Sequence, residues 1–239
     1  MMKKRLFAML CAICLVSNLC STASATTYDV AADFSATNNP NGVWSYGWSS
    51  TLTPALNLYP DNGKMGDKVG DPINIDVWFD WGQFSSYSPN VAHNPTGSIN
   101  NEHWTITWQP WQFSLHPGDG NEYSHARWTA PDAGTIDIAS MFTGIDHYLG
   151  TTTDVHVLHN GISLFNGEVN GYGDTSSFST TALNVGMGDI IDFTVGYGSN
   201  RNPTCDTTAL SATITFIPEP ATMCLLGLGA LGLLRKRRT

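Results

Sequence analysis

Apolar and polar residues alternate in short runs through the second half of the chain. Residues 134–142, 189–195 and 208–216 each keep the two-residue period of a strand that buries one face. A shorter run, residues 124–128, leads into a turn-forming segment, residues 131–134. No window in this part of the chain has the 3.6-residue period of a helix. The pattern therefore predicts a series of antiparallel strands.

The clearest pair of strands lies on either side of Asn160 and Gly161. Alternating residues 153–159 precede this dipeptide, and residues 162–165 follow it. A two-residue type I′ turn needs positive φ at both central residues, and Asn-Gly meets that requirement well. The sequence therefore predicts a β-hairpin here.

Residues 26–100 are less regular, because Asn, Pro and Gly interrupt the apolar runs. We expect strands joined by long surface loops that pack on the same sandwich, with a separate domain as the alternative. Closely spaced strands without helical patterns between them favour two packed antiparallel sheets over a doubly wound α/β fold. The expected fold is an all-β antiparallel sandwich, jelly-roll-like, over residues 26–216.

The N-terminal end has the three parts of a secretory signal peptide. Lys3 to Arg5 are basic, residues 6–16 are apolar and uncharged, and Ala23 and Ala25 form a small-residue cleavage site. We expect residues 1–25 to form a signal helix that signal peptidase removes after Ala25. This interpretation implies that the chain is exported.

The C-terminal end also combines three features. Pro218, Glu219 and Pro220 precede an apolar segment, residues 221–234, and a basic cluster, residues 235–238. The 14 apolar residues would form a helix of about 21 Å, which is short against the roughly 20 residues of a full membrane span. The basic cluster favours a cytoplasmic end. We therefore expect a short, transient hydrophobic anchor helix.

In this order, the three features resemble the PEP-CTERM sorting tail of exopolysaccharide-producing bacteria. The resemblance covers residues 217–239. It implies recognition by an exosortase, a membrane protease thought to cut near the motif, and release to the cell surface or extracellular matrix. The same tail sometimes carries an ice-binding label, which describes the tail and is no evidence of ice binding here.

A second, pattern-level resemblance covers roughly residues 100–216. Segments 127–131 and 188–193, together with Asn160 and Gly161, are similar to a β-sandwich module of secreted PEP-CTERM proteins. That module is broadly similar to jelly-roll carbohydrate-binding modules. The resemblance implies a fold and carries over no ligand-binding motif.

The net charge of −9 understates how acidic the exported part is. Seven of the 11 basic residues lie in the two terminal segments, so that part keeps four basic and 19 acidic residues, a net charge of −15. Nucleic acids and anionic membrane surfaces require clustered Lys and Arg. We therefore expect neither as a partner of the exported part. Neutral or cationic ligands and divalent cations remain compatible with this charge.

All eight tryptophans lie in the first 128 residues. Indole rings stack on the apolar faces of sugars, and exposed aromatic patches mark binding surfaces. We take Trp104, Trp108 and Trp111 as candidate ligand-stacking residues. Core packing is the alternative: on one strand Trp104 and Trp108 would share an apolar face, whereas Pro110 breaks the register before Trp111.

Calcium is the one cofactor that the turn composition suggests. Asp119, Asn121 and Glu122 lie in a glycine-rich bend, and calcium takes roughly six to eight oxygen ligands in such loops. Solvated turn acids are the alternative interpretation. The seven histidines show no zinc-ligand spacing. We expect no other cofactor.

Three functions follow from these features. The first, which we favour, is a non-catalytic surface or matrix protein that adheres to other molecules, above all to polysaccharide. The second is a structural component of the exopolysaccharide matrix, in which Cys205 could form an intermolecular cross-link. The third is a secreted hydrolase. No serine nucleophile motif is present, and the exported part offers only Glu102, Glu122 and Glu168 among its glutamates for a pair of carboxylates.

Overall fold

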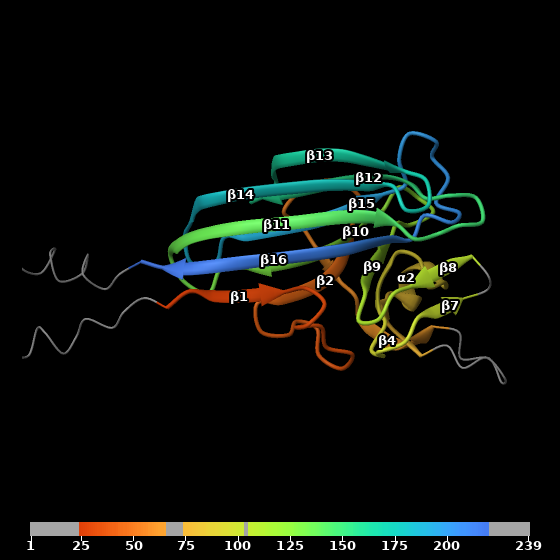
Figure 1. Cartoon of the computed structure of the whole chain (residues 1–239), viewed down its shortest axis with the longest axis horizontal. Coiled ribbons are helices and arrows are strands. Elements are labelled where there is room, and N and C mark those ends of the chain that lie inside the picture. Colours follow the sequence, from red (N-terminus) through yellow and green to blue (C-terminus); the bar gives the residue numbers. More distant parts are fainter. Residues whose placement is uncertain (1–23, 66–73, 103–104, 220–239) are drawn as a thin grey trace, which may run out of the picture.

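The chain folds into two packed antiparallel sheets, as a computed structural model shows for residues 24–65, 74–102 and 105–219 (Figure 1). The expected all-β antiparallel sandwich is therefore confirmed. The expected signal helix and anchor helix lie outside the described residues. Within the described residues, no helix is long and apolar enough to cross a membrane.

The larger sheet has the order β14-β11-β16-β9-β6-β5-β4, and β1 pairs with β16 on the same edge as β9. Its strands are β1 (Thr26–Asp29), β4 (Asp61–Met65), β5 (Ile75–Phe79), β6 (Asn90–His93), β9 (Phe113–His116), β11 (Gly134–Gly144), β14 (Thr175–Val185) and β16 (Thr208–Pro218).

The smaller sheet has the order β13-β12-β15-β10-β2-β3. Its strands are β2 (Trp44–Ser49), β3 (Asn57–Leu58), β10 (Tyr123–Thr129), β12 (Thr152–His159), β13 (Ile162–Asn170) and β15 (Ile190–Gly196). A two-stranded sheet, β7 (Asn100–Glu102) with β8 (Ile106–Trp108), and one short helix, α2 (Trp81–Phe84), complete the described elements.

The core lies between the two sheets and is built from alternate residues of each strand. On β11, Ile136, Ile138 and Phe142 point inward and are at most 2% exposed, whereas the residues between them reach the outer face. Trp128 and Phe193 of the smaller sheet fill the opposite side of this core. The two-residue sequence period therefore marks the buried face of the strands.

A second, smaller core lies on the outer face of the larger sheet. Ile75, Val77 and Ala92, on β5 and β6, pack with Trp108 of β8. The β7–β8 hairpin therefore covers one end of this outer face. The part formed by β1, β11, β14 and β16 remains open.

The predicted hairpin around Asn160 and Gly161 is confirmed. β12 and β13 pair antiparallel, with φ of 52° at Asn160 and 78° at Gly161. These positive angles are those that a type I′ turn requires. A Cβ on Gly161 would also lie 2.7 Å from Cδ of Pro54, in the loop after β2.

We expect Gly161→Ala to lower the free energy of unfolding by about 2–3 kcal/mol, because it combines left-handed backbone strain with a clash. Gly173→Ala is the matched control: φ there is 76°, but nothing lies within 4 Å of an added Cβ. It should lose only about 1 kcal/mol. Urea unfolding of both variants measures the difference. Equal losses of unfolding free energy would show that Pro54 moves away from the added methyl group without a cost in stability.

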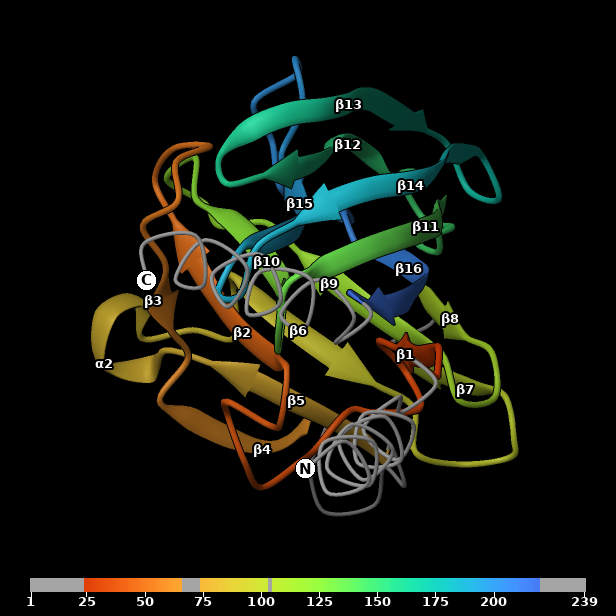
Figure 2. The same ribbon diagram turned by 90° about the vertical axis from the view of Figure 1, so that its left-hand side faces the viewer.

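The first and last strands meet at one end of the sandwich. Thr26 pairs with Phe216, so β1 begins where β16 ends, and Figure 2 views the molecule from this end. The loops around Gly150 and Gly198 lie at the opposite ends of the long strands (Figure 1). The first and last described residues therefore lie at the same end of the sandwich.

Candidate functional site

The structure separates the three candidate tryptophans. Trp108 is fully buried, and its Nε1 donates a hydrogen bond to Oγ of Ser114 at 2.9 Å. The expectation that Trp108 stacks on a ligand is therefore wrong, because the β7–β8 hairpin packs this indole against the larger sheet. Trp104 lies outside the described residues. Trp111 is 59% exposed, so it can meet a ligand.

Trp111 is held in a tight turn between β8 and β9. The N–H of Gln112 donates to the carbonyl of Gln109 at 3.2 Å, with Pro110 and Trp111 at the two central positions. Trp111 has φ of 58°, a conformation that disfavours a bulky side chain and normally selects Gly or Asn at this turn position. A strained residue that stays exposed is a candidate for function rather than for folding.

The indole of Trp111 forms one wall of a groove of about 210 Å³ on the outer face of the larger sheet. The groove is bounded by the turn after β8, the end of β1, the end of β11 and the start of β16. Its lining residues are Asp29, Ala31, Gln109, Pro110, Trp111, Gln112, Phe113, Met141, Thr143, Ala209, Leu210 and Ser211. Four segments that are far apart in the sequence therefore build it.

The groove combines an aromatic wall with short polar groups. Gln109 and Gln112 bring side-chain amides, and Thr143 and Ser211 bring hydroxyls. A Cβ added to Gly97 would be 3.8 Å from Cζ2 of Trp111, so Gly97 lies next to the indole. This combination can stack one face of a sugar ring and hydrogen-bond its hydroxyl groups.

A second exposed tryptophan lies outside the groove. Trp81 of α2 is 51% exposed, and its ring lies 6.4 Å from Phe79 and 5.8 Å from Tyr87. Sequence reasoning did not select Trp81. Trp81 does not line the groove, which makes it a useful comparison for Trp111.

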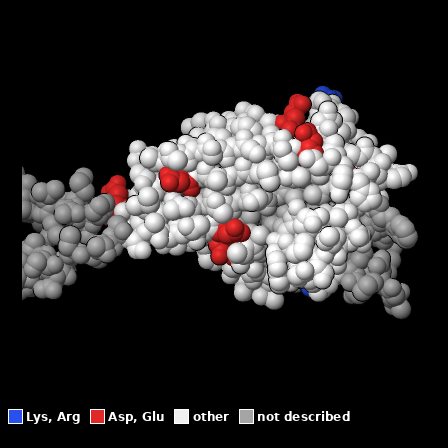
Figure 3. Space-filling view, in the orientation of Figure 1, with Lys and Arg blue, Asp and Glu red and all other residues white. Residues whose placement is uncertain are grey.

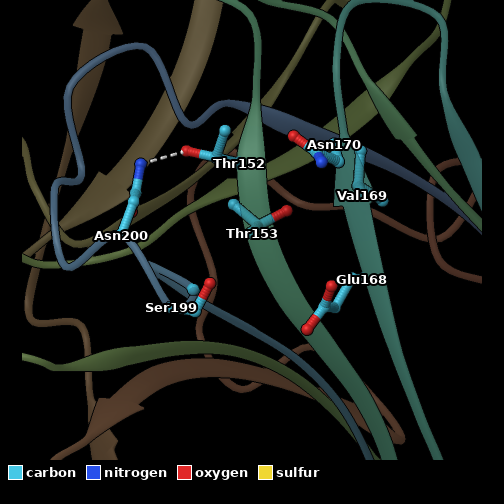
Figure 4. Close-up of a pocket in the computed structure, with 8 residues that line it drawn as sticks. Thr152, Thr153, Glu168, Val169, Asn170, Ser199 and Asn200 are labelled. Atoms are coloured by element: carbon cyan, nitrogen blue, oxygen red, sulfur yellow. Dashed lines mark hydrogen bonds between the residues drawn. The ribbon is translucent and has the colours of Figure 1, made fainter.

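A smaller pocket of about 110 Å³ lies at the end opposite the chain termini, between β12, β13 and the loop after β15 (Figure 4). Asn200 of the loop donates a hydrogen bond to Oγ1 of Thr152 at 2.6 Å. Glu168 and Asn170 of β13 stand on the other side. The pocket is polar and has no aromatic wall, so it fits sugar stacking less well than the groove does.

Two buried carboxyl groups lie next to this pocket. Oδ1 of Asp206 accepts hydrogen bonds from N and Oγ1 of Thr152, at 2.7 and 3.0 Å. In the described part of the chain, Oδ2 of Asp206 and Oδ1 of Asp146 have no partner, although both residues are at most 1% exposed. Burial raises the pKa of Asp146 to about 6 and that of Asp206 to about 7. Folding therefore favours their protonated forms.

The proposed calcium ligands do not converge on a site. Asp119 and Asn121 are exposed, and Oε2 of Glu122 accepts a hydrogen bond from the N–H of Gly120 at 2.8 Å. This contact fits the role of a turn acid. In the three described ranges, no group of three or more His, Cys, Asp or Glu residues is placed to hold a metal ion. Calcium at this bend stays a prediction.

A serine, a histidine and an aspartate come together inside the smaller sheet, which sequence reasoning did not anticipate. Oγ of Ser49 lies 2.7 Å from Nε2 of His125, whose Nδ1 lies 3.6 Å from Oδ1 of Asp192. Arg127 also donates two hydrogen bonds to Asp192, at 2.7 and 2.9 Å. All but Arg127 are at most 3% exposed. A substrate cannot reach this serine, so the contact resembles a catalytic triad in composition alone.

The sorting-motif residues begin at the end of β16. Pro218 pairs with Gly134, and the N–H of Glu219 donates to the carbonyl of Ala133 at 3.1 Å. Pro220 and Ala23 lie outside the described residues. Ala25 is exposed, directly before β1. The expected cleavage position therefore lies at an accessible strand end.

Comparison with known proteins identifies the tail. Residues 216–238 match the PEP-CTERM protein-sorting motif, so the resemblance of the C-terminal end is confirmed. No curated protein matches the chain. Among solved structures, a CBM51 module from Clostridium perfringens in complex with methyl-galactose is 8% identical, with a TM-score of 0.36, covering 58% of this chain and 91% of that one.

A family 35 carbohydrate-binding module from Clostridium thermocellum is 9% identical. Its TM-score is 0.31, and the match covers 80% of this chain and 98% of that one. In sum, the chain carries a PEP-CTERM protein-sorting motif at residues 216–238, behind an antiparallel β-sandwich.

Proposed function

We propose that the protein is an exported, non-catalytic β-sandwich that adheres to polysaccharide at the cell surface or in the extracellular matrix. Trp111 carries the binding, and the groove beside it provides the polar contacts. Exosortase recognises the tail, and the hydrophobic segment anchors the chain until it is processed. Signal peptidase removes the N-terminal segment.

The observation that carries the proposal is the exposure of Trp111 in a left-handed backbone conformation. A tryptophan at this turn position is unfavourable for folding, by about 1 kcal/mol relative to Gly. The residue is exposed, so burial of its indole offsets little of this cost. Ligand stacking supplies a reason for the sequence to keep the ring there.

The two alternatives have less support. Burial, with a contribution from Asp146, raises the pKa of the Cys205 thiol, which reduces the thiolate available for cross-linking. For a hydrolase, Glu122 already bonds Gly120, and Glu168 lines a pocket that contains no second glutamate. Neither feature favours these functions over adhesion.

We expect the purified protein to be retained on at least one of four insoluble polymers: cellulose, xylan, mannan and β-1,3-glucan. Trp111→Ala should weaken this binding about tenfold or more, equivalent to about 1.4 kcal/mol, because it removes the stacking surface. Trp81→Ala is the matched control, since it removes an indole of similar exposure outside the groove. Depletion binding isotherms measure the affinities.

The outcomes are distinct. Loss of binding in Trp111→Ala with retention in Trp81→Ala supports the groove. The reverse pattern would move the site to the surface around Trp81 and contradict the assignment. Absence of retention on all four neutral polymers and on the acidic polymers alginate and polygalacturonate would contradict the proposed function itself.

A further inference from the structure

The open outer face of the larger sheet consists almost entirely of small, hydroxyl-bearing or apolar side chains. It is formed by the odd-numbered residues of β1 and β11, by residues 211, 213, 215 and 217 of β16 and by residues 175, 177 and 179 of β14, which we call the hydroxyl face. Their even-numbered neighbours on β11 and β16 point into the core. Nine of these 14 face positions are Ser or Thr.

The register aligns this face into level rows across the strands. Met141 lies between Ser177 of β14 and Ser211 of β16, and Ala139 lies between Ser179 and Thr213 in the next row. No side chain in these rows is larger than methionine. The rows therefore form a shallow surface without a barrier across it.

The hydroxyl face has no positive charge. Its charged side chains are Asp29 and Asp137, and Oδ1 of Asp137 accepts a hydrogen bond from the N–H of Ala182 at 2.8 Å. Figure 3 shows this side of the molecule with separate acidic patches and with basic atoms only at its margins. An acidic polymer would meet repulsion here without a compensating cation, whereas a neutral polymer would not.

The hydroxyl face is continuous with the groove. Asp29, Met141, Thr143 and Ser211 belong to both. From Thr143, the face follows β11 to Thr135, a distance of about 26 Å at roughly 3.3 Å per residue. This length accommodates several sugar rings in a row, beginning beside Trp111.

We propose that the hydroxyl face extends the groove into a track for a neutral, unbranched polysaccharide, which lies along β11 and β16 with one ring stacked on Trp111. The hydroxyl groups of the face exchange hydrogen bonds with those of the polymer. This inference rests on the proposed function, and it adds the charge class, the shape and the direction of the ligand.

The test uses oligosaccharides, from disaccharide to octasaccharide, of whichever neutral polymer binds, with isothermal titration calorimetry as the measurement. Affinity should rise with chain length by about tenfold or more. Ala139→Arg places a long, charged side chain at the centre of the track, so it should abolish this rise and leave the disaccharide affinity within about twofold. Ser163→Arg adds the same charge to β13 of the other sheet and is the matched control.

The failure of this inference differs from the failure of the proposed function. The track is overturned if affinity does not depend on oligosaccharide length, or if the Ala139→Arg variant binds long oligomers as the original protein does. The proposed function still stands in that case, provided that Trp111→Ala loses binding. Stronger retention on alginate or polygalacturonate than on any neutral polymer overturns the charge class. Binding that survives Trp111→Ala contradicts the assignment of the site to Trp111, which the track extends. Circular dichroism confirms that each variant is folded.

Discussion

Replacement of Trp108 by alanine is expected to lower the free energy of unfolding by about 3–5 kcal/mol. The indole is fully buried between the β7–β8 hairpin and the larger sheet. Its removal leaves a cavity and deprives Oγ of Ser114 of its donor. Urea unfolding at constant pH measures the loss.

Trp111→Gly, three residues further along, should behave in the opposite way. Glycine adopts φ of 58° without strain, so we expect a free energy of unfolding equal to that of the original protein or about 1 kcal/mol higher. Polysaccharide binding should be lost in this variant. A loss of stability similar to that of Trp108→Ala would show that the Trp111 ring serves the fold rather than a ligand.

The contrast between these two tryptophans was partly visible in the sequence. The two-residue strand period assigned Trp108 to an apolar face, and Pro110 freed Trp111 from that register. Sequence could not show that the turn would give Trp111 a positive φ, because Gly or Asn is the usual signal for that angle. Composition alone had favoured a stacking role for both residues.

Strand β14 shows where the sequence pattern fails. Residues 175–185 are mostly Ser and Thr with few apolar residues, so the alternation is faint. They form an edge strand whose outward half is polar, and Ala182, at φ of 54°, interrupts the pairing with β11. Because this strand contributes to the hydroxyl face, that face could not be predicted from sequence.

The groove could not be predicted for a different reason. Its walls come from residues near 30, 111, 141 and 210, and only the pairing of β1 and β11 with β16 brings these positions together. Apolar periodicity predicts which residues of a strand point inward, but it does not determine the order of strands in a sheet. The strand order determines where a groove forms.

Asp206→Asn is expected to remove most of the loss of stability that the buried Asp206 carboxyl causes when it ionises at high pH. The folded-state pKa of about 7 lies above the reference value of 3.8. Stability from the protonated carboxyl is therefore fully present below about pH 4 and is lost as pH rises through about 7. The loss approaches about 4 kcal/mol at pH 8, because each pKa unit corresponds to about 1.4 kcal/mol. Asparagine stays neutral throughout and keeps the acceptor for Thr152.

The measurement is the difference in unfolding free energy between Asp206→Asn and the original protein at about pH 5 and pH 8. The asparagine amide changes the unfolding free energy by the same amount at both pH values, so comparing the two differences cancels this contribution. The variant should gain stability relative to the original protein as pH rises, whereas the exposed control Asp132→Asn should not. Identical pH profiles for the original protein and Asp206→Asn would mean that water or a cation reaches Oδ2 and compensates the buried charge.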